Sequence, residues 1–279
     1  MQLLLPTPEE LSNLKLYNGQ NEILGRAELF FLSVMKVPHL QQKLASFKYY
    51  LQFDELVRSL SSSLQLLAKA CSEVIESEKL ASMLRRLLAI GNLMNESAGK
   101  VQAKGITLDS LIQTATKRGS DDKTTVLDLL VSTAISSREN IVDFWLDMPS
   151  LRDAMRLDLE DCRLLLRDIQ NGADSVDRSI KAETSQEADS PRGSSADAYL
   201  TKLMPFALHA TCELHTTKIT FSAAEDKVRS LCSFFAEDSK TCKASTIFGV
   251  LLELSRLVEK SKECMATKVK VTKTGKGQN

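Results

Sequence analysis

Apolar residues recur at three- and four-residue steps through most of the chain, which is the spacing of one face of an α-helix. Two such stretches cover residues 8–17 and 24–36, and a third opens after Pro38. From Phe53 to Ile75 the pattern predicts a long amphipathic helix. The chain is therefore predicted to be all-α.

The second half continues this helical pattern in separate pieces. Ser150 is a candidate N-cap for a long helix, and residues 199–235 predict another in spite of Pro205. Ser245 precedes a last apolar helix. Residues 181–198 have almost no large apolar side chain and many serines, so they predict a disordered linker or surface loop.

The stretch that distinguishes this chain from other helical proteins runs from Gly91 to Val131. A buried helix leads to Gly91, and an irregular loop at residues 96–106 follows. After Thr107, a candidate N-cap, the helical period restarts. A second polar loop at residues 116–123 is basic and leads into another apolar run. Its cations are Lys117, Arg118 and Lys123.

Several short motifs follow one another in this stretch. They are Gly91-Asn92-Leu93-Met94-Asn95, Gly105-Ile106-Thr107-Leu108 with Leu111, Thr116-Lys117, Asp121, and Lys123-Thr124-Thr125-Val126-Leu127. Their order resembles the formin homology-two domain, and an ordered series is more specific than any single short motif. Leu93 replaces the usual aromatic residue and Ile106 the usual Phe, while the loop between Lys117 and Lys123 is longer by one residue.

The resemblance implies an elongated all-α fold with a knob, a helical bundle or coiled coil, and a post. Knob-like helices would occupy residues 1–52, and a long helix with a post-like region residues 53–180. After the linker, residues 199–266 would hold the C-terminal long helix and the final helix, and residues 267–279 a basic tail. The family places a lasso and a first knob helix before the point where this chain starts, so an N-terminally incomplete domain is expected.

For function, the resemblance implies actin binding at filament barbed ends, with nucleation and elongation of unbranched filaments. Lys117 matches a lysine that contacts actin in the family, and Arg118 and Lys123 share its loop. Residues 91–95 and Gly105 would belong to the post surface that receives the lasso of a second copy. The expected location is the cytoplasmic cytoskeleton.

Alternatives to this interpretation stay open. The basic loop also fits an ordinary solvated loop, and the Gly-Asn motif also fits a plain helix terminus. The whole chain also fits a truncated helical scaffold with weak or no actin assembly activity, because the lasso is absent. Self-association would then require a supplied lasso, and profilin would bind only through a proline-rich segment that is absent here.

Composition excludes several other classes of protein. Lys plus Arg equals 36 and Asp plus Glu equals 36, so the net charge of zero disfavours a nucleic-acid binder. Six scattered cysteines without a Cys-x-x-Cys pair indicate free thiols in a reducing compartment. No apolar run approaches the length of a membrane span, so membrane insertion is not expected.

Signals for an enzyme are weak. Gly99-Lys100 lacks the rest of a phosphate-binding loop, since Val101 is neither Ser nor Thr. His209, Cys212 and His215 follow helical steps that turn the two imidazoles about 120° apart, which disfavours one shared metal ion. We therefore expect no catalysis, no metal and no cofactor.

Overall fold

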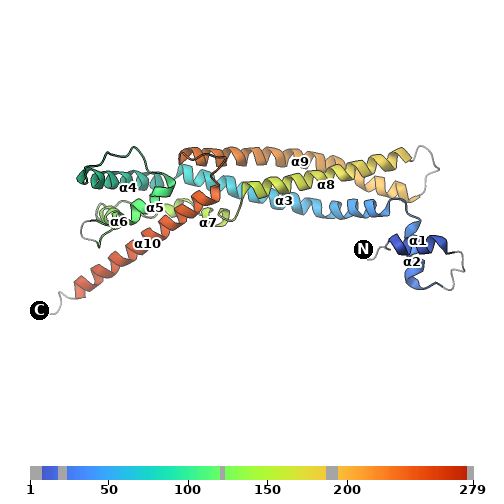
Figure 1. Cartoon of the computed structure of the whole chain (residues 1–279), viewed down its shortest axis with the longest axis horizontal. Coiled ribbons are helices and arrows are strands. Elements are labelled where there is room, and N and C mark those ends of the chain that lie inside the picture. Colours follow the sequence, from blue (N-terminus) through green and yellow to red (C-terminus); the bar gives the residue numbers. More distant parts are fainter. Residues whose placement is uncertain (1–7, 18–23, 120–122, 187–193, 275–279) are drawn as a thin grey trace. The chain divides into compact units, whose positions relative to one another are not determined.

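A computed structural model describes residues 8–17, 24–119, 123–186 and 194–274. Across these ranges the chain is helical and contains no β-strand, which confirms the predicted all-α class (Figure 1). Two compact units share the chain. Unit 1 comprises Met1–Ser59 and Leu165–Thr217, and unit 2 comprises Leu60–Leu164 and Lys218–Asn279.

The helices differ widely in length. In chain order they are α1 (Pro8–Leu16), α2 (Arg26–Met35), α3 (Leu40–Glu76), α4 (Glu78–Ser97), α5 (Leu108–Thr116), α6 (Val126–Ser136), the 3-10 helix η3 (Phe144–Asp147), α7 (Leu151–Ala154), α8 (Leu159–Gln186), α9 (Ser194–Phe234) and α10 (Ala244–Thr274). The helices α3, α8 and α9 each supply residues to both units. In the described part of the chain, every helix is too short or too polar to cross a membrane.

Unit 1 is organised around aromatic side chains from α3 and α9. Phe53 is completely buried, and the ring of Phe206 meets it edge-on with 5.2 Å between centroids. Tyr49 packs beside both rings, and its hydroxyl donates to the carbonyl of Ile169 on α8. A Cβ on Gly172 would lie 2.2 Å from the Tyr49 ring, so glycine is what lets α8 approach this tyrosine.

A buried ion pair also joins α3 to α8 within unit 1. The ammonium of Lys43 lies 2.5 Å from a carboxylate oxygen of Glu183, and the two side chains are only 7% and 9% exposed. The same ammonium lies 5.4 Å from the centre of the Tyr199 ring. Because the pair is shielded from water, each charge depends on the other for its solvation.

Unit 2 has a single continuous apolar core. Its helix α10 packs against α5, α6 and α7, and α4 packs against α5, α6 and η3. A polar contact also joins two segments of this unit: the carboxylate of Glu73 accepts from both the amide and the hydroxyl of Ser150, at 2.9 Å each. Core side chains with no exposed surface include Leu67, Leu80, Met83, Leu87, Phe144, Phe248, Leu251 and Leu254.

Several helix boundaries differ from the sequence-based expectation. The stretch after Pro38 and the stretch from Phe53 form one helix, α3. The long helix expected after Ser150 begins only at Leu159. Ser150 occupies the N-cap position of α7, but its hydroxyl is bonded to Glu73 and makes no cap hydrogen bond. Before Leu159 the chain makes only the short helix α7.

The predicted linker and tail are also partly helical. Residues 181–186 belong to α8 and residues 194–198 to α9, while 187–193 lie outside the described residues. The burial of Glu183 against Lys43 explains why a segment without large apolar residues still joins a helix. In the predicted basic tail, residues 267–274 continue α10. Pro205 lies inside α9 and does not mark its start.

Candidate functional site

The Gly91-Asn92-Leu93-Met94-Asn95 motif occupies the last turns of α4. The helix continues through Gly91 and ends at Ser97, close to the start of the loop predicted from residue 96. Gly91 lies where α4 approaches α5, and a Cβ there would come within 3.3 Å of the Thr114 methyl group. This close approach favours glycine at the position.

The helix α4 ends in a C-terminal cap that contains a glycine. Gly99 has a φ of +69°, a left-handed conformation that glycine adopts without strain. Its amide donates to the carbonyl of Glu96 at 2.9 Å, and the amide of Lys100 donates to that of Asn95 at 2.8 Å. Gly99 and Lys100 thus terminate a helix, which agrees with rejecting a phosphate-binding loop.

Asn92 ties the following loop back to α4. Its side-chain amide donates to the carbonyl of Ala103 at 2.9 Å and accepts from the amide of the same residue at 2.7 Å. Leu93 beside it is 66% exposed. A Cβ on Gly105 would contact nothing within 4 Å, so packing gives no reason for glycine there. The predicted N-cap Thr107 is confirmed, since its hydroxyl accepts from the Ser110 amide.

A small apolar groove of about 160 Å³ lies beside this loop. Its walls come from α4, the end of the loop, the start of α5, and the residue that follows α9. The lining residues are Leu84, Arg85, Leu88, Ile106, Thr107, Leu108, Leu111 and Phe235. Phe235 was not predicted as a site residue, because nothing in its local sequence indicates a neighbour from α4 or α5.

The basic loop between α5 and α6 is a short hairpin with fixed ends. Lys117 directly follows α5, and its carbonyl accepts from the amide of Val126 at 2.9 Å. The amide of Gly119 donates to the carbonyl of Thr124 at 2.9 Å, and Arg118 and Thr125 form an isolated antiparallel bridge. The side chains of the three cations at 117, 118 and 123 are exposed, and Asp121 lies outside the described residues. We call residues 117–119 and 123–125 the basic hairpin.

The far end of the hairpin is anchored by two helices. Thr125 and Asp128 form a reciprocal capping box at the start of α6, with both bonds at 3.0 Å. The other oxygen of Asp128 accepts from the hydroxyl of Ser261 on α10 at 2.6 Å, and Ser261 is only 5% exposed. The next residue, Lys262, pairs with Asp143. Ser261 and Lys262 escaped prediction because their partners are more than a hundred residues away.

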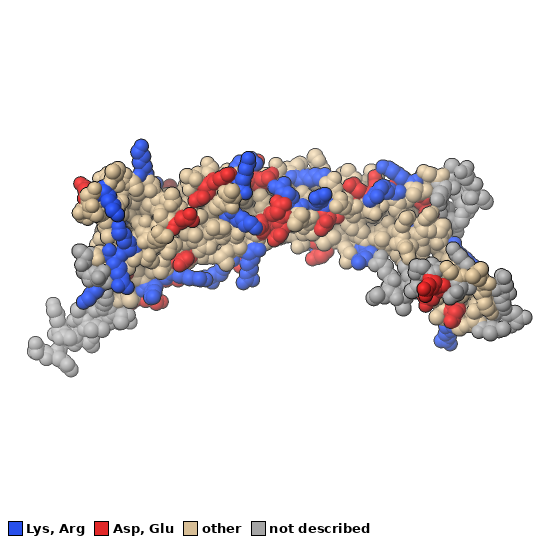
Figure 2. Space-filling model, in the orientation of Figure 1, with Lys and Arg blue, Asp and Glu red and all other residues tan. Residues whose placement is uncertain are grey.

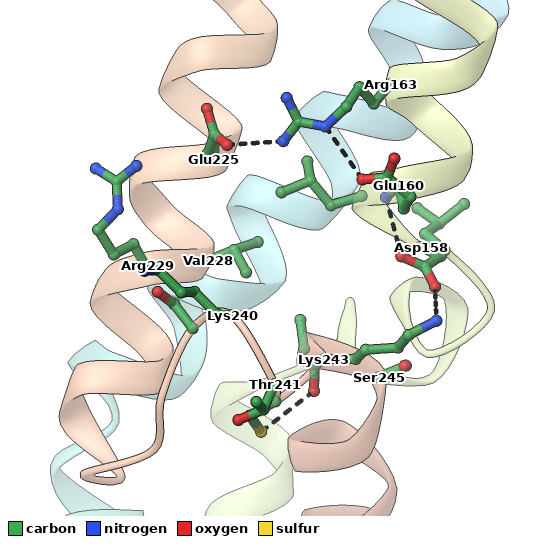
Figure 3. Close-up of a pocket in the computed structure, with 15 residues that line it drawn as sticks. Asp158, Glu160, Arg163, Glu225, Val228, Arg229, Lys240, Thr241, Lys243 and Ser245 are labelled. Atoms are coloured by element: carbon green, nitrogen blue, oxygen red, sulfur yellow. Dashed lines mark hydrogen bonds and ion pairs between the residues drawn. The ribbon is translucent and has the colours of Figure 1, made fainter.

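A second, larger recess of about 610 Å³ lies between the start of α8, the end of α9 and the segment that connects α9 to α10 (Figure 3). Its charged side chains are largely paired with one another. Arg163 contacts Glu160 at 3.1 Å and Glu225 at 2.8 Å, as Figure 3 shows. Lys243 pairs with Asp158, and this hydrogen bond holds the pKa of the Asp158 carboxyl below its ordinary value. The arrangement contains no base aimed at a nucleophile.

Other candidate chemistry is not assembled. His209 contacts Asp54 at 3.2 Å, and the described residues contain no group of His, Cys, Asp and Glu placed to hold a metal ion. Lys and Arg are mixed with Asp and Glu over much of the face in Figure 2. The basic hairpin lies within the motif-bearing stretch of the sequence. The apolar groove is lined by part of that stretch, from Ile106 to Leu111, and by none of residues 91–95 or Gly105.

Comparison with known proteins identifies the family. The profile of the Formin Homology 2 Domain matches residues 1–259. Formin-like protein 20 of Arabidopsis thaliana is 30% identical over 258 residues, which are 92% of this chain and 15% of that protein. Formin-like protein 5 of Oryza sativa subsp. japonica is 29% identical over 258 residues, with 92% of this chain and 16% of that protein covered.

A shorter relative is matched over most of its length. Putative formin-like protein 15b of Arabidopsis thaliana is 29% identical over 258 residues, which are 92% of this chain and 71% of that protein. The chain spans about a sixth of the length of the two larger relatives. Since the family profile extends over nearly the whole sequence, the chain belongs to the formin homology 2 family.

Proposed function

We propose that this chain binds actin and acts at filament barbed ends in the assembly of unbranched filaments. The single observation that carries this proposal is the basic hairpin: exposed cations on a backbone whose two ends are fixed by hydrogen bonds. The family resemblance supplies the partner, an acidic surface of actin. The activity requires no catalytic group, because holding actin subunits in place is binding and positioning.

Backbone fixation matters for the strength of such a contact. When a lysine on a mobile segment is replaced by an acidic residue, the new side chain can move away from the acidic partner. An acidic residue on a fixed backbone stays close to the acidic partner and is repelled by it. The carbonyl of Lys117 is bonded to Val126, so the Cα of this lysine is held while the ammonium stays in solvent. Lys117 is therefore the residue we assign the main contact, with Arg118 and Lys123 beside it.

We propose a second role for the surface formed by residues 91–95, Gly105 and the apolar groove. This surface receives an apolar side chain of the lasso from a second copy of the domain, as the resemblance implies. The groove supports this role because its lining is mostly apolar and Asn92 holds the adjoining loop in place. Two linked copies would then hold two actin subunits, since linkage raises the effective concentration of the second site.

The test of the proposed function is charge reversal at the hairpin. Lys117→Asp is compared with Lys218→Asp, which alters another exposed lysine of unit 2, on α9. Dissociation constants for filament barbed ends should rise about 5- to 150-fold for Lys117→Asp, which corresponds to about 1–3 kcal/mol, and less than about 2-fold for Lys218→Asp. The measurement is inhibition of barbed-end elongation by fluorescence microscopy of single filaments.

Two controls make the result specific. Far-UV circular dichroism and the unfolding temperature should be unchanged in Lys117→Asp, because an exposed hairpin charge contributes no core packing. Equal losses in the two reversal variants would contradict the proposal, since they would show that only the overall charge matters. A wild-type chain without any effect on barbed-end growth would contradict the assignment to barbed ends.

We further infer that actin is the main partner and that the chain acts in the cytoskeleton of the cytoplasm. A fluorescent fusion expressed in cells should colocalise with actin filaments, and the Lys117→Asp variant should do so less. Binding of profilin is not expected for these residues, because the composition includes only 6 prolines and none form a tract. Isothermal titration with profilin checks this expectation.

A further inference from the structure

Two thiols flank the connection between α9 and α10. Cys232 lies in the last turn of α9 and is completely buried, and Cys242 lies shortly before α10 and is half-buried. The thiol of Cys232 donates to the carbonyl of Cys242 at 3.7 Å, and each thiol influences the pKa of the other. Residues ten positions apart in sequence are thus brought side by side.

The connection itself is a folded turn and not an extended strand. The amide of Glu237 donates to the carbonyl of Cys232 at 2.9 Å, and the amide of Cys242 donates to that of Asp238 at 2.8 Å. Ala236, the residue before Glu237, has a φ of +57°. These bonds hold the two cysteines close to each other in the reduced chain.

Small molecules can reach one of the two thiols. Cys242 lines the recess of about 610 Å³ shown in Figure 3, together with polar residues of the connection such as Ser239 and Thr241. Cys232 is not among the residues that line the recess and has no exposed surface. An oxidant that enters the recess therefore meets Cys242 first, and Cys232 is the nearby thiol that can react next.

We propose that Cys232 and Cys242 form a reversible oxidation site of this chain, with a peroxide as the oxidant. In the first step the Cys242 thiol gives up its proton and its sulfur attacks a peroxide oxygen. The O–O bond breaks, the product is a sulfenic acid, and the hydroxide that leaves takes up the thiol proton and becomes water. In the second step the sulfur of Cys232 attacks the sulfur of Cys242, the S–O bond breaks, and a second water leaves. Two thiols lose two electrons, and hydrogen peroxide gains them.

The environment of Cys242 makes its oxidation slow. Burial, and next the neighbouring Cys232, raise the pKa of the Cys242 thiol to about 11. The reactive thiolate is therefore a small fraction at neutral pH. Oxidation should need sustained exposure to peroxide, in contrast to the rapid response of sensor cysteines with depressed pKa values. The disulfide, once formed, is protected because one of its sulfurs is buried.

A third thiol is close enough to compete. Cys71 on α3 is completely buried; burial raises the pKa of its thiol, and the neighbouring Cys232 raises it further. It has no access from the recess, because Cys242 and not Cys71 is among the residues that line it. The expected disulfide is therefore Cys232–Cys242, and a bond between Cys71 and Cys232 is the competing product that the experiment has to distinguish.

The experiment uses the full chain, reduced and then exposed to hydrogen peroxide. After remaining thiols are blocked by alkylation, trypsin cuts behind Arg229, Lys240 and Lys243, which separates the peptide 230–240 from the peptide 241–243. We expect these two peptides to be joined, with the mass of the pair lower by two hydrogens, and to separate after treatment with dithiothreitol. The oxidised chain should also unfold about 5 °C or more above the reduced chain, since the bond closes a loop of the unfolded state.

Matched controls come from the other cysteines. Cys242→Ser alters a half-buried position and should abolish both the joined peptides and the shift in unfolding temperature, while circular dichroism verifies its fold. Cys212, exposed on α9, reports whether the peroxide dose was sufficient. Unlinked peptides at a dose that oxidises Cys212 would overturn the proposal, and so would a Cys71–Cys232 link or overoxidation of Cys242 without a disulfide.

Discussion

Two lysines of this chain show how the same side chain serves different purposes. Lys43 in unit 1 is 7% exposed and pairs with the buried Glu183, whereas Lys117 in unit 2 is exposed on the basic hairpin. Lys43 is fixed through its charged end, and Lys117 is fixed through its backbone. A charge neutralised inside the protein contributes to the fold, while a charge held at the surface by its backbone is available for a partner.

The largest effect is expected from breaking the buried pair. Lys43→Ala leaves the Glu183 carboxylate without its counter-charge in a dry environment, and the free energy of unfolding should fall by about 3 kcal/mol. Denaturation with urea, followed by circular dichroism, measures this loss. The double variant Lys43→Met with Glu183→Gln removes both charges and should recover most of the stability. If Lys43→Ala were as stable as the wild type, the ion pair would have to be hydrated.

The next effect comes from the glycine beneath Tyr49. In Gly172→Ala the new methyl group would lie 2.2 Å from the ring, which is itself held by Phe53 and Phe206. We expect a net loss of about 1–2 kcal/mol, because overpacking outweighs the better helix propensity of alanine. In the control Gly249→Ala the new methyl group has no atom within 4 Å, and a small gain in unfolding temperature is expected. If both variants changed the stability in the same direction, this account would be contradicted.

A smaller effect concerns the anchoring of the basic hairpin. Ser261→Ala removes the hydroxyl that donates to Asp128, and the loss of this bond should cost about 1 kcal/mol. Hydrogen exchange at the amides of Thr125 and Asp128 should become faster. The control Ser255→Ala, whose hydroxyl donates to the carbonyl of Leu252 in its own helix, should leave both amides unchanged. Unchanged exchange in Ser261→Ala would show that α10 does not support the hairpin.

The smallest effect is the pH dependence contributed by the recess. The pKa of Asp158 is lowered in the folded chain, so its pair with Lys243 stabilises the fold above the ordinary Asp pKa of about 3.9. This stability is lost as the pH falls through the lower, folded pKa. Asp158→Asn should therefore lose less stability than the wild type between about pH 5 and pH 2. Parallel curves of unfolding temperature against pH would contradict the assignment.

Local patterns in the sequence predicted much of this molecule. The helical period gave the all-α class, and Thr107 was identified as a cap from its position before a periodic run. Contacts over long sequence separations were not predictable in this way. Glu183 lies in a segment that has the composition of a linker, yet it belongs to α8 and is paired with Lys43 on α3.

The candidate site shows the same limit. The motifs identified the hairpin and the end of α4, because these features are local in sequence. Phe235, the residue after α9, completes the groove, and Ser261 of α10 supports the hairpin. No spacing rule connects either residue to residues near position 100. A single sequence gives the residues of each helix, but the pairing of distant helices depends on the packing of the whole core.

The most direct test of the central claim is chemical cross-linking of the basic hairpin to actin. A zero-length carbodiimide joins a lysine amine to a carboxylate only when the two are in contact. With filaments capped by this chain, mass spectrometry should find Lys117 joined to an Asp or Glu of actin, and Lys218 should stay unlinked. Cross-links at Lys218 or elsewhere without any at the hairpin would contradict the claim that the basic hairpin meets the acidic surface of actin.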